Sequence, residues 1–177
     1  MKIDIMTLFP DLCEAYLCES IIGRARKKGA VDIVCHNIRD YTKNKQKQVD
    51  DYPYGGGSGV VMQADPIYEC YRSLFDQKRQ KPYVVYMTPQ GKTLTQQRAA
   101  QLSQLPHVAV LCGHYEGVDE RIIEKIVDEQ ISIGDYVVTG GELPALILVD
   151  CVCRMLPGVL SGEEAYTSES HFNGLLE

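Results

Sequence analysis

The sequence predicts an α/β fold with a mostly parallel sheet flanked by helices. Short apolar runs typical of strands alternate with longer segments of helical periodicity, which is the pattern of βαβ units. Three of the strand-like runs end in glycine-containing turns, and ligands of open α/β sheets bind beyond the carboxyl ends of the strands. A chain of 177 residues with 45% hydrophobic content can also bury a proper core. We therefore expect a ligand pocket at one edge of the sheet.

In the first third of the chain, two strands enclose one helix. Lys2 to Leu8 alternates apolar and polar residues, which predicts a strand. Pro10 to Lys28 predicts a helix, since proline is favoured at the first helical position. Val31 to Asn37 predicts the second strand. Arg39 to Gly59 is polar and ends in YGGGSG, so we expect a long loop that is mobile or bound to a ligand.

The rest of the chain continues this alternation. Ala64 to Gln80 predicts a helix, because apolar residues recur there at spacing i, i+3, i+4 and i+7. Further strands are predicted over Tyr83 to Met87, His107 to Cys112 and Ile131 to Ile133. Further helices are predicted over Thr95 to Leu105, Val118 to Ile126 and Gly141 to Leu156.

After Pro157 the composition changes to Ser, Glu and Gly with little periodicity. We interpret residues 1–160 as one domain and residues 161–177 as an interdomain linker or lid. The chain stops at Gly-Leu-Leu-Glu without a cap or a charged tail, from which we expect that a following domain is missing.

Composition favours a cytoplasmic protein. No apolar run approaches the roughly 20 residues that cross a bilayer, and the N-terminus has no signal-peptide cleavage site. Seven cysteines without a C-x-x-C pair predict reduced thiols. A net charge of −6 argues against a protein that binds nucleic acid over its whole surface. The basic groups at Arg24 to Lys28 and Lys43 to Lys47 are either solvated faces or phosphate contacts.

Leu111 to Pro144 is the most informative segment of the chain. Gly113 and Gly134 each follow a predicted strand, and Pro89 to Gly91 follows a third. Any one of these loops can be an ordinary turn. Because the carboxyl ends of parallel strands meet at one edge of a sheet, the three together predict one shared pocket.

Five motifs, in matching order and spacing, resemble those of the bacterial tRNA (guanine-N1)-methyltransferase family of the SPOUT class. They are DDYPYGGGSGVVM (Asp50 to Met62), YMTPQG (Tyr86 to Gly91), GHYEGVDER (Gly113 to Arg121), SIGDYVVTGGELP (Ser132 to Pro144) and ESHFNGLLE (Glu169 to Glu177). The resemblance implies methyl transfer from S-adenosyl-L-methionine to N1 of the guanosine immediately 3′ of the anticodon, position 37 of tRNA.

The resemblance also carries expectations about architecture. It implies a deep trefoil knot in the SPOUT-type fold, and a homodimer whose active site lies at the subunit interface. It further implies a C-terminal tRNA-binding domain that this chain lacks. We therefore expect the 177 residues alone to be weakly active or inactive.

The resemblance assigns cofactor binding to the three loops and substrate binding to a second set of residues. Backbone groups of such loops can read the edge of an adenine, and glycines let the ligand approach closely. The implied cofactor-binding residues are Tyr86, Met87, Pro89, Gln90, Gly113, Tyr115, Glu116, Ser132, Ile133, Gly134, Tyr136, Val138, Gly140, Gly141 and Pro144. The implied substrate-binding residues are Asp50, Gly55, Gly59, Glu116 and Ser170.

Methylation of guanine N1 needs a base and a cation, because N1 loses a proton while negative charge develops on O6. Glu169 is the candidate base and Arg154 the candidate cation. The family usually has aspartate at the position of Glu169, and the neighbouring Glu163 and Glu164 are alternative bases. Arg154 has an alternative role as well, as the i, i+4 ion-pair partner of Asp150 on one helix.

Other expectations concern departures, metal and rival functions. His114 stands where the family more often has arginine. The resemblance implies magnesium, but no cluster has metal-ligand spacing, so its ligands are unassigned. A small-molecule or protein methyltransferase and a non-catalytic nucleotide-binding module are the two rival functions. Arg154 and a carboxylate in the tail are the features that favour the RNA methyltransferase. A binding module needs neither of these two residues.

Overall fold

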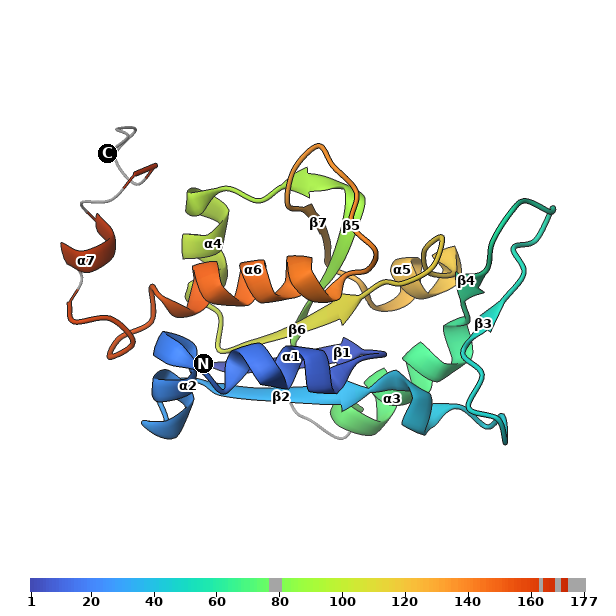
Figure 1. Ribbon diagram of the computed structural model, residues 1–177, viewed down its shortest axis with the longest axis horizontal. Coiled ribbons are helices and arrows are strands. Elements are labelled where there is room, and N and C mark those ends of the chain that lie inside the picture. The colour runs from blue at the N-terminus through green and yellow to red at the C-terminus, as the bar shows by residue number, and fades with distance from the viewer. Residues whose placement is uncertain (77–80, 163, 168–169, 172–177) are drawn as a thin grey trace.

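A sheet of five parallel strands forms the centre of the computed structural model, which describes residues 1–76, 81–162, 164–167 and 170–171 (Figure 1). All four pairings in this sheet are parallel, which confirms the predicted mostly parallel α/β fold. The trefoil knot stays a prediction. The spatial order of the strands is β2 (Asp32–Asn37), β1 (Lys2–Thr7), β6 (His107–Cys112), β5 (Tyr83–Thr93) and β7 (Glu129–Ser132).

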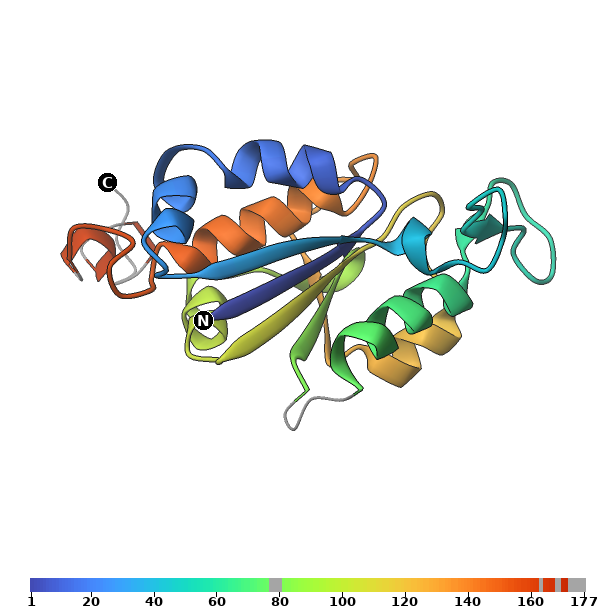
Figure 2. The same cartoon turned by 90° about the horizontal axis from the view of Figure 1, so that it is seen from below.

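Helices cover both faces of the sheet (Figure 2). The helices packed on one face are α1 (Pro10–Leu17), α2 (Ser20–Lys27), α4 (Gln96–Ser103) and α6 (Glu142–Cys153). The helices packed on the other face are α3 (Ala64–Phe75) and α5 (Glu120–Ile126). The shorter elements are the 3-10 helix η1 (Ile38–Tyr41), β3 (Asp50–Asp51), β4 (Val61–Met62) and α7 (Glu164–Thr167). None of the helices described is both long and apolar enough to cross a membrane.

The strands read as almost continuous apolar runs because both faces of the sheet are buried. Ile3 and Ile5 of β1 point into the core under α1 and α6, whereas Met6 points into the core under α3. In β6, Val110 and Leu111 divide between the two cores in the same way. Each fully buried side chain of this kind contributes about 1.5–3 kcal/mol to folding, so two-sided burial fixes the strands that carry the loops described below.

The single helix predicted from Pro10 to Lys28 is wrong, because the chain forms two helices there, α1 and α2. Ser20 has a positive φ of 50° at the junction. A Cβ atom on Gly23 would lie 2.1 Å from the carbonyl oxygen of Cys18, so only glycine permits this close approach. The break is therefore encoded by a glycine that the helical periodicity alone does not reveal.

The loop predicted from Arg39 to Gly59 contains regular structure near both ends. Its first residues belong to η1, and Asp50–Asp51 forms β3, which pairs antiparallel with β4. The hairpin (residues 50–62) has the glycine-rich run as its connecting loop, in which Gly55 and Gly59 have positive φ. Glycine adopts this backbone region at no steric cost.

The turn predicted after Met87 is a bulge within β5. Met87 and Lys92 both pair with the same residue of β7, Ile131, so the chain leaves the ladder and returns to the same partner. We call residues 88–91 the bulge segment. A Cβ atom on Gly91 would lie 2.5 Å from the backbone N of Ile131, which explains the glycine at the point of return.

Candidate functional site

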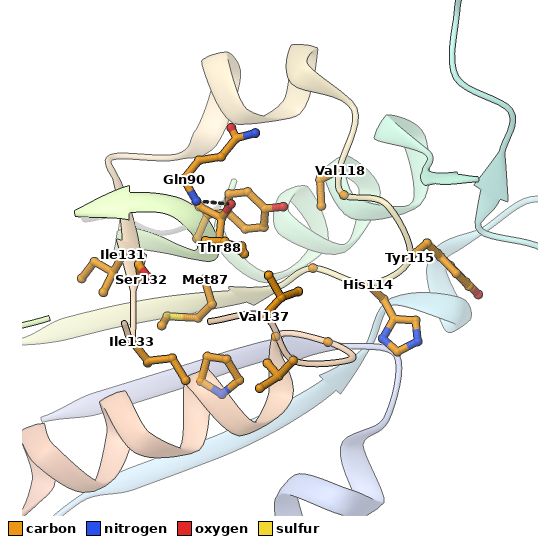
Figure 3. Close-up of a pocket in the computed structure, with 18 of the residues that line it drawn as sticks. Met87, Thr88, Gln90, His114, Tyr115, Val118, Ile131, Ser132, Ile133 and Val137 are labelled. Atoms are coloured by element: carbon orange, nitrogen blue, oxygen red, sulfur yellow. Dashed lines mark hydrogen bonds between the residues drawn. The ribbon is translucent and has the colours of Figure 1, made fainter. Parts of the chain in front are cut away.

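A cavity of about 340 Å³ lies at the carboxyl ends of β5, β6 and β7 (Figure 3). Its walls come from the bulge segment, the β6–α5 loop (residues 113–119) and the β7–α6 loop (residues 133–141), with a few residues of the adjoining elements. Three strand ends thus share one pocket, as the sequence predicts. The volume is in the range of sites that enclose a small ligand.

The cavity brings together the residues to which the resemblance assigned cofactor binding. Every one of them lines the wall except Gly134. Gly134 lies just behind the wall, where its backbone N donates a hydrogen bond to Ser132 Oγ (3.1 Å). The wall residues to which the resemblance did not assign cofactor binding are Thr88, His114, Gly117, Val118, Glu120, Ile123, Ile131, Val137 and Thr139. Most of these adjoin assigned residues in the sequence, whereas Glu120 and Ile123 project from α5, whose position depends on tertiary packing.

The β7–α6 loop and the β6–α5 loop are in direct backbone contact. The backbone N of Gly141 donates to the carbonyl oxygen of Gly113 (2.7 Å), and His114 forms a bridge with Gly140. A Cβ atom on Gly141 would lie 2.7 Å from the backbone N of Gly113 and 2.8 Å from Cα of Cys112. Backbone atoms cannot move aside as a flexible side chain can, so this contact requires glycine.

Tyr86 forms the buried back of the cavity. A Cβ atom on Gly113 would lie 2.9 Å from the Tyr86 hydroxyl, so a larger residue there would displace the ring. Burial raises the pKa of Tyr86, because the apolar surroundings disfavour the phenolate. The hydroxyl therefore stays neutral near pH 7 and can both donate and accept a hydrogen bond.

The β6–α5 loop is held in an unusual conformation by the hairpin. Tyr115 has a φ of 59°, in the left-handed region that L-residues rarely adopt. The backbone N of Glu116 donates to the carbonyl oxygen of Val60 (3.0 Å), and Met62 N donates to Gly117 O (2.9 Å). Strained residues persist where surrounding structure holds them, and they cluster at binding sites.

A buried carboxylate fixes the start of α6 to the rim of the cavity. Glu142 accepts a hydrogen bond from the Thr7 hydroxyl (2.7 Å), and its other oxygen lies 3.9 Å from His114 Nδ1. The His114 ring also packs against Phe9, with centroids 5.0 Å apart. His114 Nδ1 is buried and has no hydrogen-bond partner among the described residues. The imidazole thus occupies the rim position where the resemblance led us to expect an arginine.

The residues implied in substrate binding are only partly brought together. Glu116 lines the cavity, and Gly59 of the hairpin touches it, since a Cβ on Gly59 would lie 2.5 Å from Glu116 Cγ. Asp50 pairs with Met62 at the base of the hairpin, whereas Gly55 has no neighbour within 4 Å of a built Cβ atom. Ser170 follows α7, which lies at the opposite end of the molecule from the hairpin (Figure 1).

Arg154, the candidate cation, does not line the cavity within one chain. Helix α6 starts at the cavity wall, and Arg154 caps its other end, about 18 Å away at roughly 1.5 Å per residue. Asp150 accepts a hydrogen bond from the Tyr16 hydroxyl, which together with burial raises the pKa of Tyr16 to about 12. Glu169 and the alternative base Glu163 lie outside the described residues.

Across the described ranges, no group of three or more His, Cys, Asp or Glu side chains is arranged to hold a metal ion. No step of the chemistry below is derived through magnesium.

Comparison with known proteins gives a consistent result over the whole chain. The family model described as tRNA (Guanine-1)-methyltransferase TrmD matches residues 1–177. The chain is 59% identical to a tRNA (guanine-N(1)-)-methyltransferase of Ruminiclostridium cellulolyticum, covering 100% of this chain and 76% of that protein. It is 51% identical to the protein of the same name from Clostridioides difficile, covering 100% and 77%.

A solved structure agrees with the sequence relatives. The crystal structure of tRNA (m1G37) methyltransferase from Aquifex aeolicus matches with a TM-score of 0.84 and 40% identity, covering 92% of this chain and 72% of that one. The cavity at three strand ends, the family model and these relatives therefore lead to one conclusion: the chain belongs to the tRNA (guanine-N1)-methyltransferase family.

Proposed function

We propose that this protein transfers a methyl group from S-adenosyl-L-methionine to N1 of the guanosine at position 37 of tRNA, immediately 3′ of the anticodon. The observation that carries the proposal is the cavity, whose wall contains nearly all the residues at which the family resemblance expects the cofactor. A tRNA substrate implies a cytoplasmic enzyme, and the resemblance adds magnesium as a requirement with unassigned ligands.

The cavity suits an adenosyl ligand with a charged sulfonium. Ile131, Ile133 and Val137 supply apolar wall for the adenine ring, while the backbone of residues 133–141 and the Ser132 hydroxyl supply polar groups. The cofactor, when bound, supplies an electrophilic methyl group. Glu116 places a carboxylate at the side of the cavity that adjoins the hairpin, where the guanine edge and the cofactor would meet.

The acceptor half of the reaction needs the proton removed from guanine N1 and the negative charge on O6 stabilised. Arg154 suits the second task, since its guanidinium is permanently charged and meets an oxygen in a fixed geometry. Glu169 suits the first, with Glu163 and Glu164 as the alternatives. Ser170, which follows Glu169, is the expected substrate contact in the tail.

A homodimer would unite these residues with the cavity. Leu12 and Tyr16 on α1, and Leu143 and Ile147 on α6, leave large apolar surfaces exposed at i, i+4 spacing. A second copy packed on this face by a two-fold axis would run its α6 alongside, in the opposite direction. Arg154 of that copy would then approach the cavity of the first. The helix-length separation within one chain supports an active site shared by two subunits.

We further propose that residues 1–160 are the cofactor-binding domain and residues 161–177 a linker or lid. The curated relatives continue beyond the region that matches this chain, which is consistent with a further tRNA-binding domain. On this proposal the 177 residues bind the cofactor but turn over tRNA slowly or not at all.

The test combines cofactor calorimetry with single-turnover transfer of a radiolabelled methyl group to tRNA. In the chain extended with the C-terminal domain of a relative, we expect Arg154→Ala to lower transfer by about 10²-fold or more while cofactor affinity is unchanged, since removing one charge-stabilising donor typically costs this much. Arg24→Ala on α2 is the matched control and should behave as wild type.

Cofactor binding without transfer to any guanosine-37 tRNA, even by the chain extended with the C-terminal domain of a relative, would favour a binding module. Transfer to a small molecule or a protein but not to tRNA would favour the other rival.

A further inference from the structure

Three of the seven cysteines come together where α1 packs against β2. Cys13 lies on the buried face of α1, Cys18 caps the end of that helix, and Cys35 lies on β2. All three are free thiols, of which Cys13 is buried, Cys35 is partly buried and Cys18 is exposed. None of the three lines the donor cavity, so their proximity has no part in the proposed methyl transfer.

The guanidinium of Arg26 on α2 joins α1 to β2. It donates two hydrogen bonds to the Glu14 carboxylate (2.8 and 3.3 Å) and a third to the carbonyl oxygen of Ile33 (3.0 Å). Glu14 follows Cys13 along α1, and Ile33 precedes Cys35 by two positions on β2. Because successive side chains of a strand alternate between its faces, Ile33 and Cys35 point to the same core as Cys13. The bridge therefore holds the segments that carry Cys13 and Cys35 side by side.

The thiols of Cys13 and Cys35 are hydrogen-bonded to each other. The Cys35 thiol donates to the Cys13 sulfur, which lowers the pKa of Cys13 and raises that of Cys35, where the shared proton stays. The thiolate is the form of cysteine that reacts with oxidants and with other sulfurs. A hydrogen bond that stabilises the Cys13 thiolate therefore favours oxidation of this pair.

Cys18 contacts the same ion pair but has a different relation to Cys35. Its thiol donates to Glu14 (3.5 Å), and Arg26 donates to its sulfur (3.6 Å). Glu14 is also hydrogen-bonded to Cys35. Cys18 and Cys35 thus share one carboxylate as a partner, whereas Cys13 and Cys35 are bonded to each other. The arrangement favours a bond between Cys13 and Cys35, although Cys18 is the more accessible thiol.

We propose that Cys13 and Cys35 form a site of reversible oxidation, at which a hydroperoxide converts the two thiols to a disulfide that joins α1 to β2. Two S–H bonds break and one S–S bond forms, so the two sulfurs together lose two electrons and two protons. The hydroperoxide accepts them as its O–O bond breaks, and it leaves as an alcohol and one molecule of water. Rotation of two side chains already in contact brings the sulfurs to the bond length of about 2.05 Å. Exchange with an external thiol restores the reduced pair.

The first test identifies the disulfide by mass spectrometry of peptides. The folded chain is treated with hydrogen peroxide, the peroxide is removed, the free thiols are alkylated in urea, and the peptides are compared before and after reduction. We expect Cys13 and Cys35 in one linked pair, which Cys35→Ala abolishes. Cys18→Ser is the matched control and should leave the pair in place. Cys70 should stay unlinked, because it is buried on the other face of the sheet, where burial raises its pKa to about 12.

Three results of this mapping would overturn the proposal. A linked pair of Cys18 and Cys35 would assign the site to a different pair of thiols. Oxidation confined to Cys18 would show that exposure alone decides which thiol reacts. A bond between Cys13 and Cys35 that forms in urea but not in the folded chain would show that the native contact has no part in it.

The second test compares the thermal midpoints of the reduced and the oxidised chain. A disulfide restricts the unfolded state, so closing the loop from Cys13 to Cys35 should raise the midpoint by roughly 5–10 °C. Dithiothreitol should reverse the rise, and the Cys35→Ala variant should show none. A lower midpoint of the oxidised chain would contradict the proposal, because the native fold would then have to distort to form the bond. Neither test uses methyl transfer, so both results are independent of the proposed function.

Discussion

The two ends of α6 differ in how completely one chain builds them. At the first end, the backbone N of Gly141 donates a hydrogen bond to the carbonyl oxygen of Gly113. Glu142 is buried there and accepts a hydrogen bond from Thr7. At the second end, Arg154 is partly exposed, and the connection that follows leads to short turns and α7. The first end belongs to the wall of the cavity, whereas Arg154 at the second end does not line it.

On the proposed function, this difference indicates which part of the active site one chain builds by itself and which part needs a second chain. The donor cavity is assembled by backbone contacts within one chain, which position its wall before any ligand arrives. Arg154 is about one helix length away and, on this proposal, needs another copy of the same face to reach a cavity. Each subunit would then supply the cavity of one active site and the Arg154 of the other.

The largest expected effect comes from mixing two inactive variants. Arg154→Ala removes the proposed cation, and Gly113→Val fills the cavity against Tyr86. Each homodimer should be inactive, but mixed dimers carry one intact cavity facing one intact Arg154. Co-refolding equal amounts of the two variants, each extended with the C-terminal domain of a relative, should restore about a quarter of wild-type methyl transfer, because half of the dimers are mixed and each has one working site. If methyl transfer does not recover, Arg154 acts at the cavity of its own subunit.

A smaller but still large effect should follow Gly141→Ala at the first end of α6. The new Cβ atom would meet backbone atoms of Cys112 and Gly113 at 2.7–2.8 Å, so the contact between the two loops must open. We expect the free energy of unfolding to fall by about 3 kcal/mol or more, with loss of cofactor binding. Urea denaturation and calorimetry provide the measurements. Gly162→Ala is the control, because nothing lies within 4 Å of its Cβ position.

The smallest effect is expected toward the second end, where Tyr16 ties α1 to Asp150. Tyr16→Phe should cost about 1 kcal/mol, since it removes one hydrogen bond and keeps the ring. The hydrogen bond raises the pKa of Tyr16 from 10.0 to about 12, so its stabilisation is present below pH 10 and is lost as the pH rises from 10 to 12. Urea midpoints of wild type and variant should converge over that range. A constant difference would mean that the hydroxyl acts through packing.

Much of the fold could be predicted because its strands are buried on both faces. His107–Cys112 matches its predicted bounds, and Lys2–Thr7 differs from its prediction by one residue, since apolar runs between turn signals leave few alternatives. The break between α1 and α2 was missed because its signal is one glycine, Gly23, at the close approach of the Cys18 carbonyl oxygen, and the apolar periodicity does not change there. The bulge after Met87 was missed because proline and glycine signal a turn whether or not the strand resumes.

The site likewise contains parts that the sequence predicts and parts that depend on tertiary packing. The cavity wall was predictable because glycines and strand ends mark it in the sequence, even though Glu120 and Ile123 arrive from a helix whose packing the sequence does not state. The distance of Arg154 from the cavity was not predictable, because it depends on where α6 begins and ends relative to the cavity wall. The roles of Arg154 and Glu169 stay predictions.

The bulge segment also bears on how this enzyme scaffold can vary. Met87 and Lys92 share Ile131 as partner, so the length of residues 88–91 is uncoupled from the register of the sheet on either side. Residues added or removed there would reshape one wall of the cavity without shifting Lys92, Thr93 or the strand beyond them. A continuous ladder such as that between β1 and β2 offers no such freedom, since one inserted residue reverses every side chain that follows. The bulge is therefore a position at which the cavity could be enlarged while the sheet stays as it is.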